Sequence, residues 1–195
     1  MKALLVLVAL CRVASADDPD DSGVTHAGEA NLESKDSRQG IQLSGALGGG
    51  LAIGFRLKDA NGTGGRISLR LGEPMTPNWV LTVEIAGGGQ LHRDATTMPQ
   101  THVDNDTNLL VGAQYYPSDS FFVRVAAGIG GYMQSVAARD SVDHRYAGPA
   151  VAFGAGLEII KLKHLTFDFE LFSISLATRD GLLATTALCF GATIH

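Results

Sequence analysis

The sequence predicts a closed, antiparallel up-and-down transmembrane β-barrel of about eight strands. Three observations lead to this all-β fold class. From Gly40 onward, large apolar residues alternate with small or polar ones at period two, which separates the two faces of a strand but would spread both sets around a helix. Short polar connections alternate along the chain with longer ones. Opposite the large apolar residues lie mostly Gly, Ala, Ser and Thr, whereas a surface in water carries many lysines and glutamates.

Residues 1–16 are expected to be a signal peptide. Lys2 supplies a positive start, an apolar stretch follows, and Ala14, Ser15 and Ala16 form the small-residue pattern that precedes a cleavage site. The apolar stretch is far shorter than the roughly 20 residues that a spanning helix needs, which disfavours a retained anchor. Export through this leader would leave a mature chain with one cysteine, Cys189, and therefore no internal disulfide.

Residues 17–39 are expected to form an acidic, flexible N-terminal segment. Carboxylates outnumber basic residues there and large apolar residues are almost absent, so the segment cannot bury enough surface to fold alone. The carboxylates between Asp17 and Asp21 lack the spacing of an ordered calcium loop. The net charge of −5 argues against nucleic acid as a partner. We expect no cofactor and no metal.

Residues 40–195 are expected to form the barrel. Period-two alternation recurs in eight stretches: 41–57, 66–71, 79–85, 108–115, 121–130, 151–159, 165–171 and 187–194. An even number of strands is typical of single-chain outer-membrane barrels. Three links are short: Glu73 to Asn78, Pro117 to Ser120, and Lys161 to His164. Four are longer: Lys58 to Gly64, Arg93 to Asp104, Ser135 to Arg145, and Ala177 to Gly181. This alternation predicts long loops on one side, with both termini on the side of the short turns.

The face with the large apolar residues is expected to point outward into lipid, because small residues suit the crowded lumen of a narrow barrel. Aromatic residues gather near the short turns at Trp79, Tyr115, Tyr116, Phe121 and Phe122. Others lie toward the long loops at Phe55, Tyr132 and Phe172. They suggest two interfacial girdles. A soluble, lipocalin-like periplasmic binder would show the same alternation, and it stays an alternative.

In this pattern the region from Gly40 to His195 resembles the small OmpA/OmpX-type outer-membrane barrels. The resemblance is one of pattern and involves no residue signature. It implies a place in the outer membrane, contact with outer-membrane lipid, insertion by the barrel-assembly machinery, and a structural, adhesive or surface-interaction role. Members of the class usually finish on an outward-facing aromatic residue, whereas here Ile194 and His195 end the chain.

A charge network is expected inside the barrel. Six charged residues fall on the inward face: Arg70, Glu84, Arg124, Glu158, Asp168 and Glu170. Counted from the short turns, Arg124, Glu158 and Asp168 all lie four or five residues in, so we expect Arg124 to lie beside Glu158. Charges at that depth are too costly in lipid and should pair inside, which would plug the lumen and prevent conduction. The alternative is that these residues are separately hydrated in a water-filled interior.

A lipid-modifying enzyme at the outer rim is a second alternative. Two long loops are rich in polar residues: His92, Asp94, His102, Asp104 and Asp106 in one, and Arg139, Asp140, Ser141, Asp143 and His144 in the next. A metal site or a hydrolytic Ser141 and His144 pair is geometrically possible at such a rim. However, the sequence lacks the His-x-Ser-Asn arrangement associated with lipid A deacylases. Water-facing loops are rich in such residues in any case, so we expect no enzyme.

Overall fold

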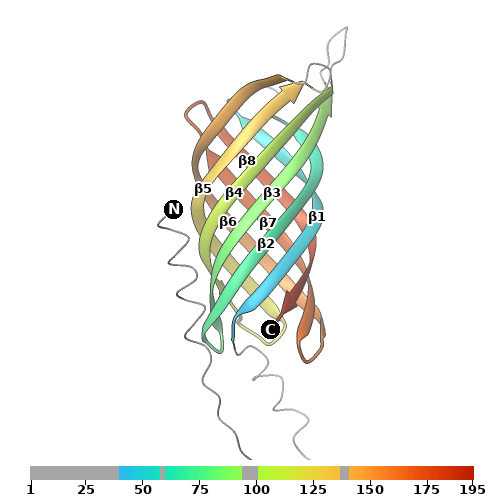
Figure 1. The fold of residues 1–195 in the computed structure, drawn as a ribbon, viewed down its shortest axis with the longest axis vertical. Helices are drawn as coiled ribbons and strands as arrows, with labels where there is room; N and C mark the ends of the chain where they lie inside the picture. Colours follow the sequence, from blue (N-terminus) through green and yellow to red (C-terminus); the bar gives the residue numbers. More distant parts are fainter. Residues whose placement is uncertain (1–39, 58–59, 94–100, 137–140) are drawn as a thin grey trace, which may run out of the picture. The chain divides into compact units, whose positions relative to one another are not determined.

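The computed structural model describes residues 40–57, 60–93, 101–136 and 141–195, so the expectations for residues 1–16 and 17–39 lie outside the described residues. Eight strands follow one another: β1 (Gln42–Phe55), β2 (Gly62–Thr76), β3 (Trp79–Arg93), β4 (Thr101–Tyr115), β5 (Phe121–Val136), β6 (Ser141–Lys161), β7 (Leu165–Ala177) and β8 (Leu182–Ile194). Each strand pairs antiparallel with its chain neighbours, and β1 also pairs with β8, so the sheet closes (Figure 1). The predicted eight-stranded up-and-down barrel is confirmed. Within the described ranges, no helix is long and apolar enough to cross a membrane.

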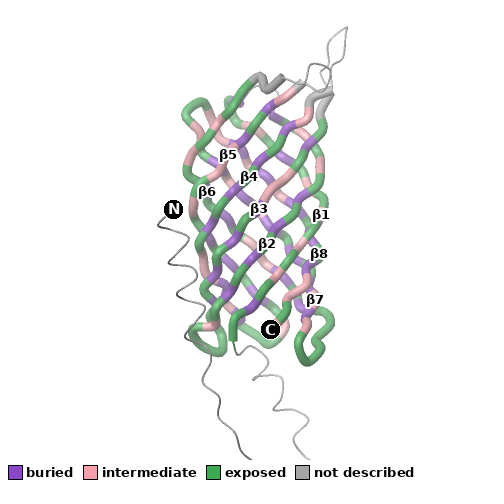
Figure 2. Tube along the Cα trace, in the orientation of Figure 1, coloured by how far each residue is buried: buried purple, intermediate pink, exposed green. Residues whose placement is uncertain are grey.

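The large apolar side chains face outward, as predicted. Leu47 and Ile67 are each 67% exposed, and Ile129 is 66% exposed. Their neighbours in the chain are buried or of intermediate exposure, and this alternation along the strands is visible in Figure 2. The barrel is therefore inverted relative to a soluble one, because its apolar surface lies on the outside and its charges lie within.

Except for β1, the strands are longer than the sequence patterns indicated. β3 and β4 pair continuously from Trp79↔Tyr115 to Arg93↔Thr101, and β6 alone has 21 residues. The predicted links Arg93 to Asp104 and Ser135 to Arg145 are thus partly strand. The polar residues of these links were assigned to loops. In a barrel, however, polar residues that point into the lumen can alternate along a strand with residues that point outward. These strands are longer than the roughly 9–11 residues that a strand needs to cross a bilayer.

The lumen contains large side chains as well as small ones. Leu110, Phe172, Ile174, Leu176 and Leu183 are each 2% exposed or less, and they pack together inside the barrel. The expectation of a lumen lined mainly by small residues is wrong at this level. Along β7 beyond Leu171 the pattern inverts, because the outward positions there are taken by Ser173, Ser175 and Ala177.

Only part of the predicted aromatic girdles exists. Near the short turns, Trp79 and Phe121 are exposed on the outside, and the Trp79 and Tyr115 rings contact each other with centroids 4.7 Å apart. Four of the predicted girdle residues are instead buried inside: Tyr116, Phe122, Tyr132 and Phe172. The physical reason is the strand period, since adjacent residues such as Tyr115 and Tyr116 cannot both face outward.

Candidate functional site: a charge network across the lumen

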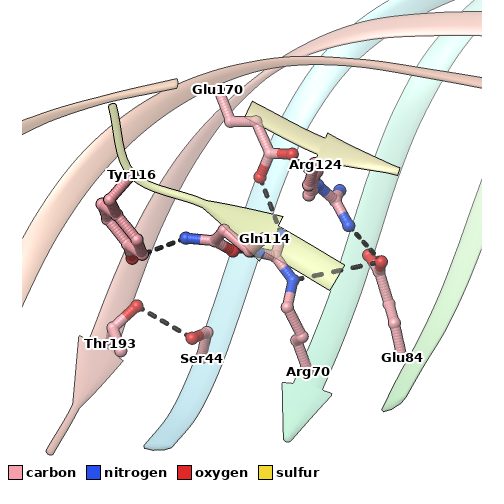
Figure 3. Close-up of polar contacts among 8 residues, drawn as sticks. All are labelled: Ser44, Arg70, Glu84, Gln114, Tyr116, Arg124, Glu170 and Thr193. Carbon is pink, nitrogen blue, oxygen red and sulfur yellow. Dashed lines mark hydrogen bonds and ion pairs between the residues drawn. The ribbon is translucent and has the colours of Figure 1, made fainter. Parts of the chain in front are cut away.

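Four charged side chains meet inside the barrel, and together they form what we call the central charge network: Arg70, Glu84, Arg124 and Glu170 (Figure 3). They come from β2, β3, β5 and β7, and each residue is at most 6% exposed. Two guanidinium groups face two carboxylates, so the network is balanced in charge.

The contacts of the network run across the lumen as well as along the wall. Arg70 and Glu84 are direct cross-strand partners, and Arg70 Nε lies 4.0 Å from Glu84 Oε2. Arg70 Nη2 also donates to Glu170 Oε2 at 2.8 Å, although β2 and β7 are not neighbours in the sheet. Arg124 donates from Nη1 to Glu84 and from Nε to Glu170. The network therefore ties β2 and β3 on one wall to β5 and β7 on another.

A glycine on β6 makes room for this arrangement. Gly154 is the cross-strand partner of Arg124 and lies between β5 and β7. A Cβ at Gly154 would lie 2.5 Å from Glu170 Oε1 and 3.0 Å from Arg124 Nε. A side chain there would displace the Glu170 carboxylate or the Arg124 side chain, so the glycine leaves room for their ion pair.

The predicted pairing of Arg124 with Glu158 is wrong. Phe121 pairs with Leu157, and the Glu158 amide donates to the Ser120 carbonyl, so Glu158 lies past the start of β5. Its carboxylate lies 2.9 Å from the Lys161 ammonium instead. Counting residues from the short turns failed because β6 extends beyond β5 at this end, as the stagger of a tilted barrel requires.

Asp168 is the remaining predicted network residue. It points inward, is 7% exposed, and lies opposite Glu158 in the ladder. Within the described part of the chain it has no ion pair at 4.0 Å or less. The structure thus brings together four of the six predicted residues and leaves Glu158 and Asp168 at the short-turn end.

Polar side chains continue the network toward the short turns. Arg70 Nη1 donates to Gln114 Oε1 at 2.8 Å, and Gln114 Nε2 donates to the Tyr116 hydroxyl at 2.5 Å. Below them the Ser44 and Thr193 hydroxyls are 2.8 Å apart and join β1 to β8 (Figure 3). Each of these groups lies on the inward face, so hydrogen bonds connect several strands at this level.

A second inward ion pair lies toward the long loops, and it was not predicted from the sequence. Arg66 Nη2 lies 2.9 Å from Asp106 Oδ2, which also accepts a hydrogen bond from Asn108. Phe172 separates the two groups of ions. The Arg124 guanidinium lies 3.6 Å from its ring centroid and that of Arg66 lies 5.6 Å away. Arg66 precedes Arg70 by four residues and so shares its inward face, which is the signal that could have found it.

Solved structures show which fold this is. Ail, the attachment invasion locus protein of Yersinia pestis, matches with a TM-score of 0.55 at 14% identity, over 80% of this chain and 99% of that one. The chain has the fold of the small eight-stranded outer-membrane barrels. Neisserial surface protein A gives a TM-score of 0.53 at 9% identity, over 79% of this chain and 96% of that one. OprG from Pseudomonas aeruginosa gives 0.52 at 12% identity, over 83% and 99%. No protein-family model and no curated protein matches the sequence.

Of the polar groups predicted for the rim, only the side chains of Asp104, Asp106 and His144 are among the described residues. Asp104 and Asp106 lie inside the lumen, where Asp104 accepts from the Tyr132 hydroxyl at 2.6 Å and Asp106 binds Arg66. His144 is exposed, with its ring 6.0 Å from that of Tyr146. The side chain of Ser141 lies outside the described residues. Among the described residues, no group of three or more His, Cys, Asp or Glu side chains is placed to hold a metal ion.

Proposed function

We propose that this chain is an integral outer-membrane protein with a plugged, non-conducting lumen and a structural, adhesive or surface-interaction role. The observation that carries the proposal is the outward face. Large apolar side chains are exposed on all eight strands. A monomer in water rarely exposes an apolar patch larger than a few hundred Å², whereas a hydrocarbon environment favours such a surface. Outer-membrane lipid is then the principal partner, and insertion by the barrel-assembly machinery follows from the same location.

The contents of the lumen support the plugged state. The central charge network crosses the barrel, and Phe172 and Leu110 fill the level above it together with Ile174, Leu176 and Leu183. Ions paired in this way offer no free charge to a passing ion. An apolar layer also excludes the water that a hydrated ion would bring with it.

A role at the cell surface is supported by two structural neighbours. Ail is by its name an attachment invasion locus protein and has been solved with the heparin analogue sucrose octasulfate, and Neisserial surface protein A is named for its location. In the present chain, the strands β3 to β6 extend past the apolar band toward the long loops. Such extensions would hold the connecting loops above the lipid, where another surface can reach them.

The location is tested by extraction from membranes. Because hydrocarbon and not charge would hold the barrel, the mature protein is expected to stay in the outer-membrane fraction after washing with high salt and with alkaline carbonate. A periplasmic protein released by osmotic shock and a peripheral protein released by carbonate serve as controls. Recovery of the chain in the soluble periplasmic fraction would contradict the proposal and favour the soluble binder.

The plugged lumen is tested with the native thiol. Cys189 is 4% exposed, faces the lumen, and is the cross-strand partner of Glu170. A small methanethiosulfonate reagent is expected to leave Cys189 unmodified in the folded barrel and to modify it after unfolding. A Thr76→Cys, Cys189→Ser variant, whose thiol is exposed at a short turn, supplies the rate of a reachable cysteine. Modification of native Cys189 at that rate, together with ion conductance in planar bilayers, would show that the lumen is open.

A further inference from the structure

A patch of glycines leaves the wall of the barrel without side chains at one place. Gly49 pairs with Gly65 across β1 and β2, and Gly65 pairs with Gly89 across β2 and β3. Beside this patch lies a cavity of about 20 Å³. Its lining includes Gly50, Gly64, Gly88, Arg66, Gln90 and Asp106.

Three polar atoms of the lining side chains have no hydrogen-bond partner among the described residues: Asp106 Oδ1, Gln90 Oε1 and Arg66 Nε. The three residues are 3%, 5% and 7% exposed. The other polar atoms of Asp106 and Arg66 are engaged, because Asp106 Oδ2 binds Arg66 Nη2, and Arg66 Nη1 donates to Thr185 at 2.6 Å. A buried polar atom that lacks a partner costs about 1–3 kcal/mol. Three of them around one cavity therefore point to a ligand that supplies the missing hydrogen bonds.

We propose that this cavity binds one or two water molecules, which donate to Asp106 Oδ1 and Gln90 Oε1 and accept from Arg66 Nε. The inference is independent of the proposed function. The ligand must both accept and donate, which a metal ion cannot do, and the Arg66 guanidinium would also repel a cation. The volume suits water, since a buried water needs roughly 10–15 Å³ and two to four polar partners.

The glycines explain why the space exists. At Gly88 a Cβ would lie 2.7 Å from Asp106 Oδ1, and at Gly50 it would lie 2.1 Å from the Thr186 carbonyl oxygen. Side chains are thus excluded from the inner side of the patch. Gly65 also lines the cavity, but it is an exposed position, and a Cβ there would meet nothing nearer than 3.8 Å. Gly65→Ala is therefore a matched control that adds a methyl group to the same patch without a clash with Asp106 or the strand backbone.

The proposal is tested by water-selective nuclear Overhauser spectroscopy on the barrel folded in detergent micelles. In the wild-type protein, the amide and α protons of Gly64 and Gly88 are expected to show cross-peaks to a long-lived water. Gly65→Ala should keep these cross-peaks. Gln90→Leu removes one of the three polar partners and should weaken them.

Two results would overturn the assignment. One is the absence of long-lived water cross-peaks at Gly64 and Gly88 in the wild-type protein, and the other is cross-peaks of undiminished intensity in a folded Gln90→Leu variant. Folding of each variant is checked by its heat-dependent shift in gel mobility. Should Gln90→Leu fail to fold, the wild-type spectrum decides alone, because the site is defined by which protons contact the water.

Discussion

Replacement of Arg124 with alanine is expected to lower the free energy of unfolding by about 3 to 5 kcal/mol. Arg124 donates to both carboxylates of the central charge network, Glu84 and Glu170, which are 1% and 2% exposed. The variant leaves those carboxylates with Arg70 as their remaining cation in the network. A buried carboxylate that has lost its counterion is far more costly than the ion pair is favourable, which is why the expected loss is large.

The measurement is urea unfolding in micelles or liposomes, followed by the fluorescence of Trp79, the single tryptophan, and by gel mobility. Lys161→Ala is the matched control, since it also removes one cation from an ion pair, that with Glu158. The Lys161 side chain is 30% exposed and its loss removes this cation from a single carboxylate, so it should cost less than the loss of Arg124, which serves two. Equal effects of the two variants would show that Arg124 is not in a buried network.

A double-mutant cycle separates the observed network from the one expected from the sequence. Arg124→Ala combined with Glu170→Gln should deviate from additivity by well over the few tenths of a kcal/mol expected of independent sites. Arg124→Ala combined with Glu158→Gln should be close to additive, because the structure gives Glu158 a different partner, Lys161. Stronger coupling to Glu158 than to Glu170 would contradict the register described above.

Phe172→Ala is expected to destabilise the barrel by a similar amount, about 3 to 5 kcal/mol. The ring is 2% exposed and packs within the apolar cluster of the lumen. It also lies between the guanidinium groups of Arg124 and Arg66, so its removal leaves a cavity and exposes both cations to each other. Phe172→Leu keeps most of the volume but loses the contact between cation and ring, and should cost roughly 1 to 2 kcal/mol.

The comparison is with Phe169→Ala on the same strand. Phe169 is 47% exposed on the outward face, where lipid or detergent fills the space that a smaller side chain leaves. Its replacement should therefore cost clearly less than that of Phe172, because no cavity forms. A larger loss of stability at Phe169 than at Phe172 would mean that the two faces of β7 have been exchanged.

The fold was readable from the sequence because a membrane barrel repeats one simple pattern. Alternation from Leu43 to Phe55 assigns both faces of β1, and the short links such as Pro117 to Ser120 set the order of hairpins. These are local properties, and strand period and turn chemistry determine them. The same parity could have assigned Tyr132 and Phe172 to the lumen, had it been followed past the stretches of clear alternation.

The partners within the lumen were not readable in this way. Arg70 and Glu170 are 100 residues apart, and they meet because of the diameter and stagger of the closed barrel. Counting from the turns gives the height of a side chain only if neighbouring strands are level at that end. Here β6 extends four residues beyond β5 at the short-turn end, because Phe121, the first residue of β5, pairs with Leu157 and not with Lys161. Which carboxylate lies nearest to Arg124 is thus decided by tilt, which no single strand encodes.

The pairing of β1 with β8 places the last strand of this barrel beside its first. The Ser44 and Thr193 hydroxyls that join them are separated by 149 residues of chain. Contacts of such high sequence separation form slowly, because the entropy of closing the loop is lost before the pairing is gained. Until β8 arrives, β1 and β7 each present an unpaired edge, and an open sheet with an apolar face is prone to aggregate. The rate at which this seam closes therefore sets how long both edges and the apolar face stay open to other chains.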